Sequence, residues 1–156
     1  MAQTSRPPAI TKIEEFAPME KDYIYRYGQY YIIDNLSPVR FTAMAKNTSK
    51  YSTKTSGLFK ITSNDKSIHL QGLIANNLLA NSSRLLTGSP SGELVFKPSI
   101  TNIGKYQATI DIKSDNSSSQ NSITLIILPI KVFFFFFAGL LLLIVISKLK
   151  LKHELK

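Results

Sequence analysis

The sequence contains no cysteine, no tryptophan and only two histidines among its 156 residues. Without cysteine the chain offers no disulfide scaffold, no thiol nucleophile and no thiolate ligands for zinc or iron–sulfur clusters. His69 and His153 are far apart in the sequence, so a histidine metal site or a Ser-His-Asp triad lacks material. The carboxylates occur singly and show no pairing in an apolar setting, which is what tunes catalytic acids and bases. The sequence therefore predicts a protein that is not an enzyme and that uses no cofactor or metal.

Long hydrophobic runs are absent from most of the chain and concentrated near its C-terminus. The mean hydropathy is only +0.01, yet residues 132–146 form an unbroken apolar run with five consecutive phenylalanines. This run alone would extend about 22 Å as a helix, whereas a bilayer core is about 30 Å thick. A helix over residues 129–151 makes up the difference, because flanking lysine stems can lift their ammonium groups to the headgroups. A domain of about 100 residues is too small to bury such a run, so we expect a transmembrane helix.

Seven residues are expected to anchor this helix in the bilayer. Pro129 suits the first helical turn, where its missing N–H costs nothing. The remaining anchor residues are the apolar Phe133, Phe137 and Leu143 and the cationic Lys131, Lys148 and Lys150.

Charge on either side of the helix predicts its orientation. The formal net charge is +9, and the segment 147–156 carries four lysines and one glutamate, against Lys131 alone on the other side. The positive-inside rule then makes 152–156 a short basic cytoplasmic tail and leaves the preceding domain outside the cell membrane. The first residues lack the apolar core of a signal peptide. Two interpretations therefore stay open: the sequence begins downstream of the real start, or the protein is tail-anchored with its domain facing the cytoplasm.

The part before the helix shows strand periodicity. Residues 1–20, with three prolines and little periodicity, are predicted to be a flexible N-terminal segment. Residues 39–46 and 106–113 alternate apolar and polar side chains, which is typical of half-buried strands. Shorter candidate strands cover residues 23–27, 29–33, 58–63, 67–71, 93–97 and 122–128. Turn-rich stretches separate them at residues 47–57, 64–66, 81–92 and 114–121.

Seven or eight short strands without a convincing amphipathic helix indicate a fold that is mainly β. We expect an immunoglobulin-like antiparallel β-sandwich over residues 21–128, with a closed barrel as the alternative, followed by one C-terminal transmembrane helix. Residues 73–80 are expected to form an irregular connection. Because Leu128 directly precedes Pro129, the last strand should pass into the helix without a linker. The domain should then lie close to the bilayer.

Four stretches carry a family resemblance: residues 47–59, 78–84, 103–110 and 125–131. In this order they resemble the membrane-proximal immunoglobulin-like domain of bacterial surface proteins related to the WxL-interacting protein family, including similar proteins of candidate-phylum bacteria. The resemblance implies an immunoglobulin-like fold that is followed in the chain by a single membrane helix. It also implies that the domain lies at the cell surface.

The motif residues in these stretches have a structural interpretation. Gly57 lies between the two strands of the first stretch. Gly104 can adopt positive φ in the turn before a strand, and Tyr106 can bury its ring while its hydroxyl reaches the backbone, as in a tyrosine corner. Asn81, with the two serines after it, can cap loop amides.

Two groups of residues form candidate interaction surfaces. Tyr23, Tyr25 and Tyr27 share one face of an expected strand, which would bind a sugar or a protein if exposed and would be an ordinary sheet face if buried. Lys46, Lys50 and Lys54 lie in a polar stretch that would suit an anionic cell-wall polymer or lipid, although a solvated charged surface is the more ordinary explanation. No nucleic-acid-binding motif appears, so neither nucleic acid nor a small-molecule substrate is expected.

These observations lead to one functional hypothesis and one alternative. The first is a non-catalytic single-pass membrane protein that presents its sandwich at the cell surface, as an anchoring module or as one that binds another protein or the cell wall. The alternative is a tail-anchored subunit or adaptor of a larger membrane complex, with its domain in the cytoplasm. In both, the lipid bilayer is a partner.

Overall fold

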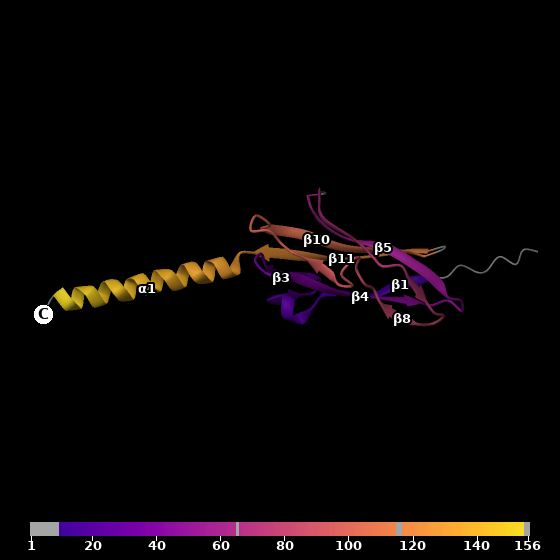
Figure 1. The fold of residues 1–156 in the computed structure, drawn as a ribbon, viewed down its shortest axis with the longest axis horizontal. Coiled ribbons are helices and arrows are strands. Elements are labelled where there is room, and N and C mark those ends of the chain that lie inside the picture. Colours follow the sequence, from indigo (N-terminus) through magenta and orange to yellow (C-terminus); the bar gives the residue numbers. More distant parts are fainter. Residues whose placement is uncertain (1–9, 65, 115–116, 155–156) are drawn as a thin grey trace, which may run out of the picture.

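Two β-sheets pack against each other and a single long helix continues from the last strand (Figure 1). The computed structural model describes residues 10–64, 66–114 and 117–154, and side chains as far as residue 148. The first sheet has the order β1–β4–β8, and β9 also pairs with β4. Its strands are β1 (Thr11–Pro18), β4 (Val39–Asn47), β8 (Ser83–Leu85) and β9 (Leu94–Phe96).

The second sheet has the order β2–β3–β11–β10–β5–β6, and β7 also pairs with β5. Its strands are β2 (Tyr25–Tyr27), β3 (Tyr30–Asp34), β5 (Thr53–Ser63), β6 (Lys66–Gly72), β7 (Asn76–Leu78), β10 (Gly104–Ser114) and β11 (Ser117–Leu128). A short 3-10 turn, η1 (Glu20–Asp22), precedes β2. One pair, β3 with β11, is parallel, and the other strand pairs described are antiparallel. The predicted fold class, an immunoglobulin-like sandwich followed by an apolar helix, is confirmed.

The core lies between the sheets and follows the period-two pattern of the sequence. On β4 the alternate residues Val39, Phe41, Ala43 and Ala45 are buried. Three phenylalanines from three strands meet at the centre. The ring centroids of Phe41 and Phe59 are 4.9 Å apart, and those of Phe16 and Phe41 are 5.8 Å apart.

The N-terminal part of the sandwich differs from the prediction. The flexible segment predicted over residues 1–20 is wrong for residues 11–18. These residues form β1, which pairs with β4, and Phe16 is 5% exposed. A β-bulge between Ile13 and Glu15 inserts an extra residue and breaks the alternation that would have revealed the strand. Residues 1–9 lie outside the described residues. The sandwich therefore includes residues 11–18 and does not begin at residue 21.

Several strands extend into stretches that were predicted as turns or irregular connections. β5 already begins at Thr53 and β11 at Ser117, and β7 and β8 occupy parts of residues 73–92. The asparagines and lysines in these strands have low strand propensity. Cross-strand pairing overrides it, as in the register of Lys113 with both Ser56 and Ser118.

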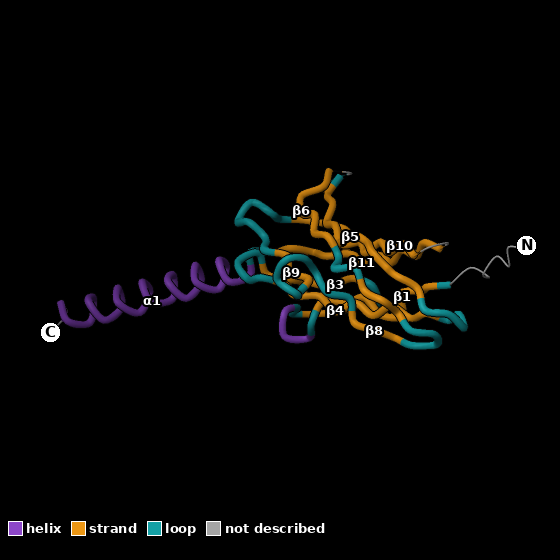
Figure 2. Tube along the Cα trace, turned by 45° about the vertical axis from the view of Figure 1, so that its right-hand side comes forward, coloured by secondary structure: helices purple, strands orange, loops and turns teal. Residues whose placement is uncertain are grey.

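The helix α1 (Ile130–Glu154) leaves the sandwich along its long axis, opposite the end at which β1 starts (Figures 1 and 2). Its segment Ile130–Lys148 has a mean hydropathy of 2.7 and none of it is buried, so it is long and apolar enough to span a membrane. The helix continues to Glu154 and so includes three of the residues predicted as a tail, 152–154. Residues 155–156 lie outside the described part of the chain.

Candidate functional site

The junction between the sandwich and α1 is built by residues from three separate elements. β11 ends at Leu128 and α1 begins at Ile130, while the carbonyl of Pro129 accepts the first helical bond from Phe133 N, at 3.1 Å. Neither Leu128 nor Pro129 has a side chain that could cap the helix. Asp34, the last residue of β3, takes this role: its Oδ1 accepts a hydrogen bond from Lys131 N at 3.0 Å. A residue from another strand thus satisfies a free N–H group at the start of the helix.

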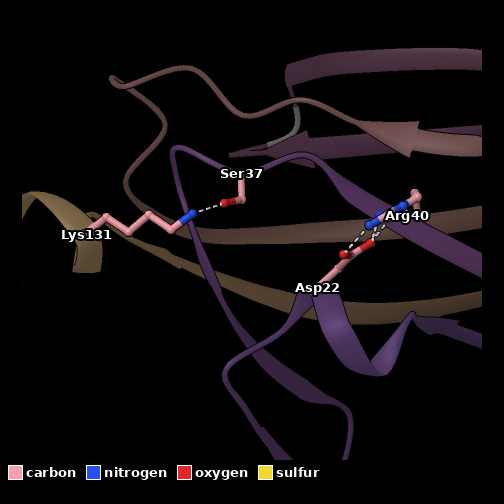
Figure 3. Close-up of polar contacts among 4 residues, drawn as sticks. All are labelled: Asp22, Ser37, Arg40 and Lys131. Atoms are coloured by element: carbon pink, nitrogen blue, oxygen red, sulfur yellow. Dashed lines mark hydrogen bonds and ion pairs between the residues drawn. The ribbon is translucent and has the colours of Figure 1, made fainter.

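The side chain of Lys131 turns back toward the sandwich (Figure 3). Its Nζ donates a hydrogen bond to Ser37 Oγ and lies 3.8 Å from Asp34 Oδ2, which also accepts a bond from Leu36 N at 3.0 Å. The Asp34 side chain is only 6% exposed. Its negative charge lies against the positive end of the helix dipole, which is a favourable position. These contacts tie the first turn of α1 to the loop between β3 and β4.

A second ion pair, between Asp22 and Arg40, lies beside the junction (Figure 3). Arg40 Nε and Nη2 donate to the two carboxylate oxygens at 2.8 and 2.7 Å, and Arg40 N donates to Oδ2 at 2.9 Å. Hydrogen bonding to Arg40 lowers the pKa of Asp22 below its ordinary value. Both residues line a hollow of about 320 Å³ together with Asp34, Ser37 and Lys131. The bidentate pair fixes η1 against β4.

The predicted anchor residues from Lys131 onward lie along α1, whereas Pro129, predicted in the first helical turn, directly precedes the helix. Phe133, Phe137 and Leu143 are 57%, 59% and 65% exposed, so the sandwich covers little of their surface. Lys148 is also exposed, at the end of the apolar segment. The side chain of Lys150 lies outside the described residues.

The four predicted structural residues occupy loops and core. Gly104, the first residue of β10, has φ +115°, and Asn81 has φ +51° in the turn before β8. A Cβ at Gly57 would lie 2.1 Å from the carbonyl oxygen of Asp111, so β5 and β10 approach too closely there for any side chain. The ring of Tyr106 is buried. Among the described residues, its hydroxyl contacts the side chain of Asn102, from which it accepts a long hydrogen bond of 3.5 Å, and forms no hydrogen bond with the backbone.

The serines after Asn81 differ in detail from the prediction that they cap amides. Ser82 Oγ donates to the carbonyl of Leu79 at 2.8 Å, and Ser83 Oγ donates to Glu14 Oε2 at 2.6 Å. In these contacts both hydroxyls donate to oxygen atoms, whereas capping an amide would require them to accept a hydrogen bond. The latter bond links β8 to the bulge of β1.

The tyrosine group is divided by the structure. Tyr23 packs against the core, where its ring centroid is 5.3 Å from that of Tyr31. Tyr25 and Tyr27 lie on β2, an edge strand of the second sheet, and are 59% and 74% exposed. Tyr30, on the adjacent strand, is 45% exposed. Three exposed aromatic rings therefore gather at one sheet edge, which is a common feature of binding surfaces.

The lysine group lies at the opposite end of the sandwich from α1. Lys46 is near the end of β4 and forms an ion pair with Glu14 at 2.8 Å. The hydrogen bond from Lys46 lowers the pKa of Glu14. Lys50 and Lys54 are exposed, in the loop after β4 and at the start of β5. The structure therefore does not combine the tyrosine and lysine groups into one surface.

His69, on the edge strand β6, packs between two aromatic rings. Its ring centroid is 5.6 Å from those of both Phe59 and Phe96. Burial lowers the pKa of His69, because the charged form would lose its hydration. Within the described part of the chain no hydrogen-bond partner reaches its Nε2. This histidine contributes to the packing of the sandwich edge.

Sequence reasoning missed the junction residues Asp22, Asp34, Ser37 and Arg40. One signal was present, since a long helix that begins after Leu-Pro has no capping side chain of its own and requires one from elsewhere. Among the residues described, no group of three or more histidines and carboxylates could hold a metal ion.

Comparison with known proteins supports the fold. No protein-family model matches the chain, and no curated protein matches it. Among solved structures it is similar to the CARDB domain of a Pyrococcus furiosus protein, which was solved in complex with di-metal ions. The TM-score is 0.50 at 9% identity, over 82% of this chain and 98% of that one. The likeness shows an immunoglobulin-like, CARDB-like β-sandwich, here followed by a C-terminal apolar helix.

Proposed function

We propose that this protein is a non-catalytic single-pass membrane protein whose α1 spans the bilayer and whose sandwich is presented at the cell surface. The observation that carries the proposal is the junction. A helix whose unburied apolar segment is 19 residues long starts directly after β11 and is held to the domain by Asp34, Ser37 and Lys131. Such a construction suits a domain held close to a bilayer rather than one on a flexible stalk.

The interaction partner is best sought at the tyrosine edge. Tyr25 and Tyr27 on the edge strand β2 are exposed together with Tyr30 on the adjacent β3. At the other end, Lys46 is already paired with Glu14, which leaves Lys50 and Lys54 for an anionic polymer. We therefore favour another surface or membrane protein as the partner. A photo-crosslinking residue in place of Tyr27 should capture it, and the same residue in place of Lys50 should not.

The relation to the WxL-interacting protein family is part of the proposal. It rests on the four sequence stretches given above and on the roles of two of their residues. Gly57 permits the close approach of β5 to β10, and Gly104 adopts positive φ before β10. Under this relation the cell is bacterial and the sandwich lies outside the cytoplasm.

The orientation can be tested with single cysteines, because the chain has none. Cells that express Lys50→Cys or Lys156→Cys are treated with a membrane-impermeant maleimide before and after permeabilisation. We expect Lys50→Cys to react in intact cells and Lys156→Cys only after permeabilisation. The reverse pattern would favour the tail-anchored alternative, and equal reaction of both in intact cells would contradict a membrane-spanning helix.

A further inference from the structure

The end of the sandwich that faces α1 carries exposed aliphatic side chains. Leu36, Ile100 and Ile103 are 44%, 67% and 54% exposed. Leu36 lies in the loop between β3 and β4, and the two isoleucines lie in the loop between β9 and β10. Exposed aliphatic residues scattered singly over a surface need no explanation. These three gather at one end, and we call them the foot.

The strand register places the foot level with the start of the helix. Asp34 pairs with Leu128, so Leu36 lies just beyond the end of β11. Gly104 pairs with Ile127, so Ile103 lies opposite Leu128. The two loops are joined by a hydrogen bond from the fully buried Asn35, whose Nδ2 donates to the carbonyl of Ile100 at 2.9 Å. Both loops therefore lie level with the first turn of α1.

The foot is also fixed relative to the helix. Asp34 accepts bonds from Leu36 N and Lys131 N, and Ser37 accepts one from the Lys131 ammonium. A bilayer that contains α1 would therefore meet these loops in a defined position. Ile24, which is 56% exposed, lines the hollow at the same junction.

We infer that the foot inserts at the boundary between the headgroups and the acyl chains of the bilayer that α1 spans, so that the sandwich contacts the membrane at Leu36, Ile100 and Ile103 as well as through its helix. The occupant of this surface is lipid, because the foot lies level with the start of the apolar segment at Ile130. Aliphatic side chains buried just below the headgroups lose their contact with water, which favours insertion. The inference rests on the proposed membrane span.

The absence of tryptophan makes the foot directly testable. Single-tryptophan variants of the full chain, Leu36→Trp, Ile100→Trp and Ile103→Trp, are reconstituted in vesicles of phosphatidylcholine brominated at shallow positions of the acyl chain. Leu79→Trp is the matched control, because Leu79 is also an exposed leucine, 66%, but lies near the other end of the sandwich. Leu141→Trp, in the middle of the apolar segment, reports the helix when deep-brominated lipid is used.

We expect bromine quenching several-fold stronger at the three foot positions than at Leu79→Trp, together with a blue-shifted emission. Quenching of Leu141→Trp without quenching at the foot would overturn the inference and leave the membrane span intact. Absence of quenching at Leu141→Trp would instead overturn the proposed span. Foot quenching equal to that of Leu79→Trp would mean that the whole domain contacts lipid non-specifically, which also contradicts the inference.

Discussion

Asp34 at the end of β3 accepts a hydrogen bond from the backbone N–H of Lys131, 97 residues later in the chain, at 3.0 Å. The same carboxylate accepts a bond from Leu36 N and lies 3.8 Å from the Lys131 ammonium. A strand residue therefore caps the helix and fixes the direction in which α1 leaves the sandwich. The contact links the fold to the membrane function proposed for it.

Loss of this cap should loosen the junction. In Asp34→Ala the N–H of Lys131 loses its partner, at a cost of about 0.5–2 kcal/mol. Spin labels on Leu79→Cys and Leu143→Cys, in nanodiscs, measure the distance between domain and helix. We expect a broader distance distribution in Asp34→Ala than in the parent. An unchanged distribution would show that Asp34 does not orient the helix, and Asp111→Ala serves as a control away from the junction.

The N-terminal strand should be essential for stability. Phe16 contacts the core rings of both sheets, with centroid distances of 5.8 Å to Phe41 and 6.1 Å to Phe59. Phe16→Ala should lower the free energy of unfolding by about 3–5 kcal/mol, as for other buried phenylalanines. Urea unfolding of the full chain in detergent micelles measures the loss. A change below about 1 kcal/mol, within the range of surface substitutions, would mean that β1 is not part of the core.

Two glycines of neighbouring strands should respond differently to alanine. A Cβ added at Gly57 would lie 2.1 Å from the carbonyl oxygen of Asp111. A Cβ added at Gly72, which pairs with Leu58 on the neighbouring strand, would have open space around it. Gly57→Ala should therefore destabilise the sandwich by roughly 1–3 kcal/mol through overpacking, and Gly72→Ala should have little effect. Thermal unfolding of both variants side by side provides the comparison. Equal melting temperatures would contradict the close approach of β5 and β10.

The stability of the sandwich should decrease below neutral pH because of His69. Burial lowers its pKa in the folded state, so between the folded value and the usual value of about 6.5 the unfolded state binds more protons. The free energy of unfolding is therefore free of this penalty above about pH 6.5. It decreases as the pH falls from there toward the folded pKa of His69. Urea unfolding at a series of pH values should show this decline in the parent chain and in His153→Gln. His69→Phe should show a flatter profile, and an equal decline in His69→Phe would exclude His69 as its source.

The sequence predicts those features that are local. Alternation along β4 and β10 indicates their buried faces, and the apolar run 132–146 indicates the helix. The features that were missed depend on contacts between distant residues. The bulge between Ile13 and Glu15 conceals the period of β1, and its pairing with β4 is visible only in three dimensions.

The candidate site was missed for the same reason. Asp34 and Lys131 are polar residues without a motif, and only the parallel pairing of β3 with β11 brings them together. The tyrosines were predicted as a group, but a group prediction does not reveal that Tyr23 packs against the core while Tyr25 and Tyr27 are exposed. Side-chain burial at an edge strand depends on what packs over it, and a single sequence does not contain this information.

The most direct test of the central claim is extraction of the full chain from membranes with alkaline carbonate. We expect the parent chain to remain in the membrane pellet. The variant Leu140→Arg/Leu141→Arg should be released, because each arginine at the centre of a membrane helix costs about 2.5–3.5 kcal/mol. The control Leu79→Arg, on the sandwich, should remain in the pellet like the parent. Release of the parent chain into the supernatant would contradict the claim that α1 anchors the sandwich by spanning the bilayer.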